Sequence, residues 1–391
     1  MPTLIYCTGF EYGLETPSVK GGGLIYDKYG TVTVQSTTKR TGGYALRCYA
    51  ASEAATSPEW RLASGESYYF VGRVYIRVGT APSATTALIR QSHAQTYFHI
   101  GYNQATSQFY AQVGINTAQA GPTVELDTWY RIDYRFSADA TTYTIDWQVD
   151  GIDQTQATKG SLTAAVFLAT TYFRLGLFAA VTGDIYFDDF VLSETSGDYP
   201  IGAGGVIGLR PNADGTHNNA ANIMEDSAGN DIDGSTYFAY DKLDEDPWIT
   251  TANADYVRQT DIGTANYCEI NFADTTETVI HGVRGILQYA SATSTANNGA
   301  CQVRDSNDQV TTILGTPDVP VDMSYTEAFY ASAQIATPSG GWTMAHVNAL
   351  RARFGYSGDA TPDPYWLAMI LEVAYGIAAT PTWIPKVIMV M

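Results

Sequence analysis

The stretch WYRIDYRF, Trp129–Phe136, decides the fold class of the first half of the chain, together with YTIDWQVDG, Tyr143–Gly151. Apolar and polar residues alternate in both, and a period of two places the apolar side chains on one face of a β-strand. The Asp150-Gly151 pair then predicts a tight hairpin turn, because both central residues of such a turn need positive φ. We therefore expect antiparallel strands, each with one buried face.

A further alternating stretch precedes these two. In YYFVGRVYIRV, Tyr68–Val78, the apolar residues of one side are Phe70, Val74, Ile76 and Val78. Short strands with Gly- and Thr-rich turns, and no convincing amphipathic helix among them, are typical of an antiparallel sandwich or jelly roll.

The composition favours two such domains. The chain has 391 residues, which suits two domains of about 200 residues each. It is 45% hydrophobic, enough for packed cores, and only 16% charged, while tyrosine occurs 28 times. Few charges and many Thr and Tyr residues favour half-buried sheet surfaces over solvated helices.

The boundary between the domains is predicted from IYFDDFVL, Ile185–Leu192, and from the segment directly after it. IYFDDFVL reads as a closing strand, and SETSGDYPIGAGG, Ser193–Gly205, has the composition of a linker. We expect an all-β chain of two β-sandwich domains, residues 1–196 and an acidic 207–391, joined by a Gly/Ser/Pro linker at 197–206. On a regular strand Asp188 and Asp189 would face opposite sides of the sheet.

The second half predicts further strands at YCEINF, Tyr267–Phe272, and TVIHGVRGILQYA, Thr278–Ala290. YWLAMILEVAY, Tyr365–Tyr375, fits either a strand buried on both faces or a short core helix, since periodicity alone does not separate the two. A helix is predicted after Trp342, with Thr343 as its cap and Gly355 as its stop.

Charge and cysteines narrow the function classes. The net charge is −19, with 13 Lys and Arg against 17 Asp and Glu up to residue 196, and 8 against 23 beyond it. Such a chain repels phosphate, so we expect no nucleic-acid partner. No segment is apolar enough to span a membrane, and the start of the chain does not read as a signal peptide, which predicts synthesis in a cytoplasm. Cys7, Cys48, Cys268 and Cys301 lack CxxC spacing and are expected to be buried thiols, with one pair in each half as the alternative.

The first half resembles laminin-G-like, concanavalin-like jelly-roll domains. The residues that carry the resemblance are, in order, GFEYG at 9–13, GGYALRC at 42–48, SYYFVGRVYIR at 67–77, LDTWYRIDYRF at 126–136, WQVDG at 147–151 and YFDDFVL at 186–192.

With the second half included, the chain looks like a recurrent two-domain bacteriophage virion protein. The added motifs are FDDFVLSETSG at 187–197, LRPNADGT at 209–216, DEDPWITTANADYV at 244–257, GGWTMAHVNALRARFG at 340–355 and ILEVAY at 370–375. The resemblance implies a non-enzymatic structural protein exposed on the particle, as a capsid decoration, fibre or tail component. Its partners would be other virion proteins and copies of itself.

Related jelly rolls often hold a structural calcium where the first strand meets the last. By that resemblance Glu11 and Asp189 would supply carboxylate ligands, and no other cofactor is expected. The competing interpretation is that Asp188 and Asp189 are edge residues that discourage sheet-to-sheet association.

Two alternative functions stay open. A carbohydrate-binding adhesin, attaching to host or surface glycans, would use aromatic platforms, for which Tyr97, Tyr102 and Tyr110 are candidates on expected loops. A glycoside hydrolase of concanavalin-like fold would need two carboxylates aimed into one cleft. The Glu-x-Asp-x-Glu strand of such enzymes is missing from the sequence, so no catalytic residue is predicted.

Overall fold

The chain folds mainly into antiparallel β-sheets. The computed structural model describes residues 4–13, 27–51, 57–61, 69–93, 96–139, 142–160, 172–218, 224–230, 232, 238–244, 256–259, 267–291, 299–307, 309–314, 329–356 and 364–377. Within these ranges the only α-helix is α1, Met344–Asn348. No described helix is long and apolar enough to cross a membrane.

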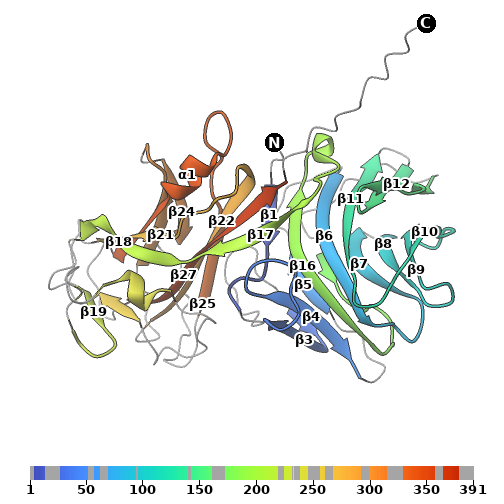
Figure 1. Cartoon of the computed structure of the whole chain (residues 1–391), viewed down its shortest axis with the longest axis horizontal. Coiled ribbons are helices and arrows are strands. Elements are labelled where there is room, and N and C mark those ends of the chain that lie inside the picture. Colours follow the sequence, from blue (N-terminus) through green and yellow to red (C-terminus); the bar gives the residue numbers. More distant parts are fainter. Residues whose placement is uncertain are drawn as a thin grey trace, which may run out of the picture.

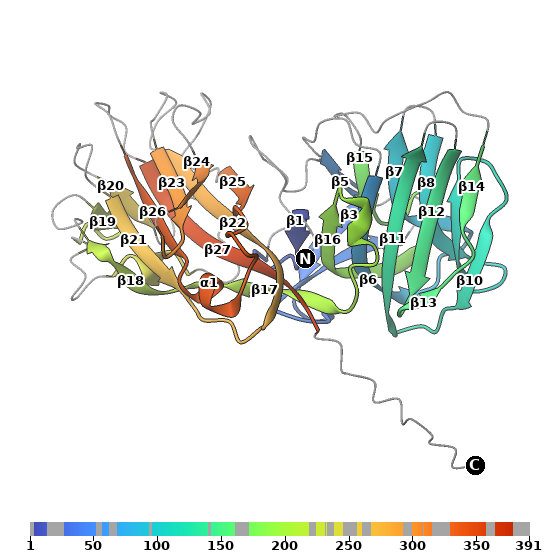
Figure 2. The same ribbon diagram turned by 90° about the horizontal axis from the view of Figure 1, so that it is seen from above.

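The first unit, residues 4–193, contains two sheets that pack face to face (Figure 2). One sheet follows the order β13-β12-β11-β6-β16-β4-β3, with β1 also on β16 and β14 on β12. Its strands are β1 Leu4–Thr8, β3 Thr31–Gln35, β4 Ala45–Ala50, β6 Tyr69–Thr80, β11 Trp129–Asp139, β12 Thr142–Val149, β13 Ile152–Asp153, β14 Ala157–Lys159 and β16 Gly183–Ser193. The other follows the order β10-β9-β8-β7-β15-β5-β2. Its strands are β2 Asp27–Tyr29, β5 Ser57–Arg61, β7 Thr86–His93, β8 Thr96–Asn103, β9 Gln108–Val113, β10 Gln119–Thr123 and β15 Tyr172–Leu175.

The second unit, residues 204–376, also contains two sheets (Figure 1). The first follows the order β19-β20-β27-β22-β25, with β17 also on β27. Its strands are β17 Gly204–Leu209, β19 Met224–Asp226, β20 Val257–Gln259, β22 Val279–Ser291, β25 Phe329–Gln334 and β27 Pro364–Gly376. The second follows the order β18-β21-β26-β23-β24. Its strands are β18 Pro211–Asn218, β21 Tyr267–Phe272, β23 Gly299–Arg304, β24 Val310–Leu314 and β26 Arg351–Tyr356.

The strands predicted from alternation in the first unit are confirmed. β11 pairs with β12 on one side and with β6 on the other. The alternating apolar residues of all three are buried in one shared core, as a half-buried strand requires. The four cysteines are also buried and free, as expected.

The ambiguous run Tyr365–Tyr375 is a strand, β27, with both faces covered. Leu367, Met369 and Leu371 pack into the core of the second unit. Ala368 and Ile370 instead join the core of the first unit, so the sheet that contains β27 is covered from two sides. This explains why the run is apolar except for Glu372.

The predicted helix is only partly correct. Thr343 caps α1, because its side chain accepts a hydrogen bond from the His346 amide. Gly355 as the stop is wrong: α1 ends at Asn348, and Gly355 lies within β26, which pairs with β21 and β23. Alternate burial in β26 of Ala352 and Phe354 shows a period of two there.

The two units contact each other along β1 and β17. β1 pairs with β16 of the first unit and also packs against β22 and β27 of the second (Figures 1 and 2). β17 pairs with β27 and contacts β16. It begins at Gly204, within the segment 197–206 that reads as a linker.

Candidate functional site

A buried polar network, here called the junction network, lies where the two units meet. Its ionisable members are Glu11, Arg40, Arg73, Asp188, Asp189, Arg284 and Glu372. They come from β6, β16, β22 and β27 and from the chain segments next to β1 and β4.

Asp188 and Asp189 lie at a break in the pairing of β16. On one edge, β16 pairs with β4 up to Phe187 and with β1 from Phe190 onward. The register with β6 shifts after Asp188, and Asp189 has a φ of 55°. The expectation that the two side chains face opposite sides of a regular strand is therefore wrong here, because the strand is bulged. Both side chains are fully buried on the same edge and meet the same loop.

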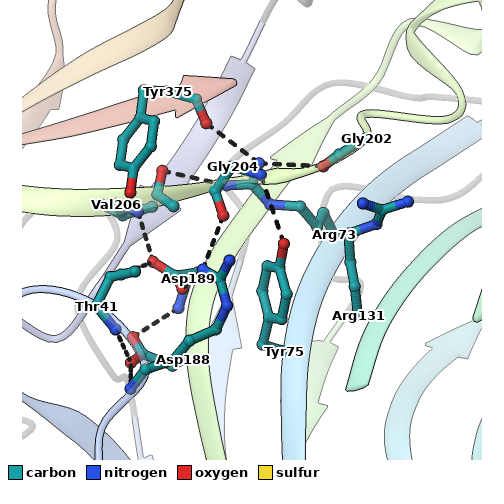
Figure 3. A network of polar contacts seen from close by, with 12 residues as sticks. Thr41, Arg73, Tyr75, Arg131, Asp188, Asp189, Gly202, Gly204, Val206 and Tyr375 are labelled. Atoms are coloured by element: carbon teal, nitrogen blue, oxygen red, sulfur yellow. Dashed lines mark hydrogen bonds and ion pairs between the residues drawn. The ribbon is translucent and has the colours of Figure 1, made fainter. Parts of the chain in front are cut away.

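The loop before β4 supplies hydrogen-bond donors to this break. The amides of Arg40 and Thr41 donate to Asp188 Oδ2 at 2.8 and 3.3 Å, and the Asp189 amide donates to Asp188 Oδ1 at 2.8 Å. The Thr41 hydroxyl donates to Asp189 Oδ1. Where no strand partner is present, side-chain carboxylates thus satisfy backbone donors (Figure 3).

Two arginines of the first unit reach the backbone of the segment that enters the second. Arg40 pairs with Asp189 Oδ2, donates to the Gly204 carbonyl at 2.8 Å, and lies 3.4 Å above the Tyr75 ring. Arg73 is fully buried and donates to the carbonyls of Gly202, Gly205 and Tyr375 at 3.2–3.3 Å.

Two backbone amides of the same segment donate back to the first unit. The Val206 amide donates to Asp189 Oδ1 (Figure 3). The Gly202 amide donates to Asp133 Oδ1 at 2.9 Å. The entry to the second unit is therefore held by hydrogen bonds in both directions.

Glu372 is the counterpart on the second unit. Its Oε1 accepts from the Thr8 hydroxyl at 2.9 Å and from the amides of Gly9 and Glu11 at 3.2 and 3.1 Å. Its Oε2 lies 3.7 Å from Arg284 Nη1, which also donates to the Cys7 carbonyl at 3.1 Å. The end of β1 is thereby held to β27 and β22 by charge-assisted hydrogen bonds.

Burial dominates the electrostatics of this network. It raises the pKa of Glu11 to about 8, with repulsion from Glu372 and Asp189 adding to the effect and the Gly43 amide opposing it. Burial, with repulsion from Asp189, also raises the pKa of Asp188, and burial raises that of Glu372. Burial lowers the pKa of Arg73. The buried charges are stabilised by one another, so removing one member leaves its partner uncompensated.

The predicted calcium pair, Glu11 and Asp189, lies within this network. Asp189 Oδ2 is paired with Arg40, and its Oδ1 accepts from Thr41 and Val206, so the carboxylate is already occupied by donors. Glu11 Oε2 accepts from the Gly43 amide at 2.7 Å. Among the residues that the structure describes, no group of three or more His, Cys, Asp or Glu side chains is placed to hold a metal ion. As arranged, the pair does not fit a calcium ion, and calcium binding stays a prediction for titration to test.

The three candidate aromatic residues lie in strands rather than on loops. Tyr97 and Tyr102 belong to β8 and Tyr110 to β9. Tyr102 and Tyr110 are buried, at 2% and 6% exposure, whereas Tyr97 is 38% exposed. Tyr102 packs in the core. Only Tyr97 is therefore placed to meet a partner or a sugar.

Sequence reasoning missed Arg73, Arg284 and Glu372. Arg284 and Glu372 are each the one charged residue of a largely apolar strand, whereas β6 contains Arg77 besides Arg73, and burying a charge is costly in such surroundings. That isolation was a usable signal: a single Glu in YWLAMILEVAY and a single Arg in TVIHGVRGILQYA, on paired strands, predict a buried ion pair. Arg284 and Glu372 are in fact directly opposite in the pairing of β22 with β27.

No protein-family model matches the sequence. No curated protein matches it.

Solved structures show only distant likenesses. A sialidase from Trypanosoma rangeli is 14% identical over 46% of this chain, with a TM-score of 0.33, and the chain spans 29% of that protein. Domain 4 of an extracellular arabinanase from Geobacillus stearothermophilus is 15% identical over 44% of this chain and 80% of its own length, with a TM-score of 0.29. A carbohydrate esterase from the Shiga toxin-encoding bacteriophage phi24B is 16% identical over 43% of this chain and 88% of its own, with a TM-score of 0.32. At these scores the likenesses support no assignment of activity.

Proposed function

We propose that this chain is a non-enzymatic structural protein of a bacteriophage virion, acting through protein–protein interfaces. Its two units would be jelly-roll sandwiches, residues 1–196 and 207–391, that fix the distance between a docked face and an exposed face of the particle. The virion setting rests on the sequence motifs quoted above, and the chain would be a decoration, fibre or tail component.

The observation that carries the proposal is the junction network. Ile286, Ala368 and Ile370 of the second unit belong to the core of the first, and buried ion pairs surround that contact. Domains of one chain commonly move relative to each other unless their interface is large and apolar. A rigid two-unit body suits a lattice component, because it transmits a fixed geometry from one neighbour to the next.

The acidic charge agrees with this role. A net charge of −19 keeps an exposed particle soluble and weakly adhesive to nucleic acid. Copies of the chain would assemble with closed symmetry, as most homo-oligomers do.

The test is cryo-electron microscopy of the bacteriophage particle that carries this chain, at side-chain resolution. We expect the chain at regular positions on the head or tail, with the two units in contact along β1 and β17. Absence from purified particles, or two units that average out as independent densities, would overturn the proposal. A reducing-sugar assay over a panel of polysaccharides is expected to stay flat.

A second candidate function is saccharide binding on the virion surface. It is favoured by Tyr97 of β8, whose large aromatic side chain is 38% exposed at the surface of the sheet. Exposed aromatic rings stack on apolar faces of ligands while their polar edges stay hydrated.

A further inference from the structure

A cluster of cationic and aromatic side chains lies on the outer face of the sheet that contains β7, β8 and β15. The core side of these strands carries Ile89, Phe98, Ile100, Phe173 and Leu175. The other side, here called the outer-face cluster, carries Arg90, Tyr97, His99 and Arg174. Arg90 is directly opposite both His99 on β8 and Arg174 on β15. Pairing alone therefore gathers two arginines and a histidine at one place, with Glu59 of β5 directly opposite Arg174.

The cluster is held together by ring contacts. The Arg90 guanidinium lies 3.6 Å from the centre of the Tyr97 ring and 5.7 Å from that of Phe178. Tyr97 also stacks on His99, with ring centres 5.7 Å apart. Such stacking orients the guanidinium and leaves its N–H donors directed to the side.

Arg90 differs from other arginines on the outer sheet faces in how its charge is balanced. On the larger sheet of the same unit Arg47 pairs with Asp184, Arg77 with Asp127 and Arg135 with Asp146. Within the described part of the chain, Arg90 forms no ion pair with a carboxylate, and the contacts around it are aromatic and cationic. Like charges directly opposite on neighbouring strands are destabilising.

Burial and the neighbouring arginines shift the pKa values in this cluster. Burial lowers the pKa of Arg90, and the nearby Arg174 lowers it further. Burial, with repulsion from Arg90, lowers the pKa of His99 to about 4, so this ring is neutral near pH 7. His99 Nε2 is buried and has no hydrogen-bond partner. An oxyanion beside Arg90 would offset its repulsion from Arg174 and accept a charge-assisted hydrogen bond from Arg90.

We propose that the outer-face cluster binds an acidic saccharide. A carboxylate or sulfate group of the sugar would accept hydrogen bonds from Arg90, and the sugar ring would pack against the exposed part of Tyr97. This inference rests on saccharide binding, the second candidate function, and adds to it the charge class of the ligand.

The experiment measures binding of the full chain to immobilised polymers by biolayer interferometry, at low salt and without divalent cations. Polygalacturonate presents carboxylates, dextran sulfate presents sulfates, and neutral dextran and polyglutamate are the comparison surfaces. We expect binding to polygalacturonate or to dextran sulfate, which tells the two acid groups apart, and none to dextran or polyglutamate.

Variants then locate the site. Arg90→Gln is expected to weaken binding at least about tenfold, the effect of losing a charge-assisted hydrogen bond. Tyr97→Ala should weaken it more than Tyr97→Phe does. The control is Arg47→Gln, which removes an arginine near Tyr49 on the other sheet and should leave binding within about twofold of the unmodified chain. Thermal unfolding checks that each variant is folded.

Four results would overturn the inference. Equal binding to polyglutamate would show a general polyanion surface, and unchanged binding by Arg90→Gln would place the site elsewhere. Binding to dextran alone would retain the saccharide function but refute the acidic ligand, whereas no binding to any sugar polymer would refute both. None of these outcomes affects the structural role, which particle microscopy tests separately.

Discussion

Two arginine–tyrosine stacks in the first unit have nearly the same geometry and opposite surroundings. Arg40 lies 3.4 Å from the centre of the Tyr75 ring, and Arg90 lies 3.6 Å from that of Tyr97. Arg40 is paired with the buried Asp189 and also reaches the Gly204 carbonyl. Arg90 has no such carboxylate among the described residues, and its tyrosine is partly exposed. At the junction the arginine of the stack has a carboxylate partner within the protein, whereas the arginine on the outer face has none among the described residues.

The largest effect is expected from Asp189→Asn. This change removes the charge but suits the positive φ of the position, since Asn tolerates the left-handed region. It leaves Arg40 without its anion, and breaking a buried ion pair costs about 3–5 kcal/mol of unfolding free energy. Urea denaturation followed by tryptophan fluorescence measures the loss.

Asp127→Asn is the matched control for that change. Asp127 also has positive φ and also pairs with an arginine, Arg77, but its side chain is 65% exposed. An exposed pair contributes at most about 1 kcal/mol. Equal losses in the two variants would contradict the view that burial makes the junction the stronger of the two ion-pair sites.

The contrast between the two stacks also shows which parts of the structure could be predicted from the sequence. Alternation in Trp129–Phe136 and Tyr143–Gly151 was enough to predict β11 and β12, because a half-buried strand repeats every two residues. Asp188 and Asp189 were singled out, but their shared orientation depends on the change of strand partner from β4 to β1. Such a change is a long-range event that local spacing does not encode. The outer-face cluster was missed for the same reason, since Arg90 and Arg174 meet only through the pairing of β7 with β15.

The next effect is expected from Arg40→Ala. Losing its charge-assisted hydrogen bonds should cost about 1.5–3 kcal/mol, less than the loss of Asp189, because Arg40 is 21% exposed and water can replace part of it. The variant leaves Glu11, Asp188 and Asp189 without a nearby guanidinium from this loop. Calcium should then raise the unfolding midpoint of the variant by about 2–4 °C and leave that of the unmodified chain unchanged.

Differential scanning calorimetry with calcium or with a chelator tells whether calcium binds these carboxylates in the unmodified chain or only after Arg40 is removed. A calcium-dependent rise in the unmodified chain would show that Glu11 and Asp189 bind the ion beside Arg40, as the sequence resemblance implies. Failure of calcium to stabilise Arg40→Ala would show that the three carboxylates are not arranged to share a cation.

A smaller effect is expected from pH. The pKa of Glu11 is raised by burial from 4.5 to about 8, so the folded chain holds a proton that the unfolded chain has already released. Its stabilising contribution is complete below the ordinary pKa and falls as pH rises toward the folded value. Between pH 7 and pH 8 the unfolding free energy should drop by about 1 kcal/mol.

Glu11→Gln tests the assignment of that slope. The variant does not titrate, so its unfolding free energy should change less over this interval than that of the unmodified chain. Asp188 shifts in the same direction and keeps part of the slope. An unchanged slope in Glu11→Gln would mean that Glu11 is ionised in the folded chain, contrary to its buried position.

The smallest effect on stability is expected from Arg90→Gln, and it tests the comparison most sharply. Arg90 has no carboxylate to lose and has Arg174 directly opposite, so removing its charge relieves repulsion while it sacrifices the stack on Tyr97. These terms oppose each other, and the unfolding free energy should change by no more than about 0.5 kcal/mol. A loss above about 1 kcal/mol would mean that this stack also supports the fold, as the Arg40 stack does. A small change, together with lost binding to acidic sugars, would separate an arginine that holds the fold from one that holds a ligand.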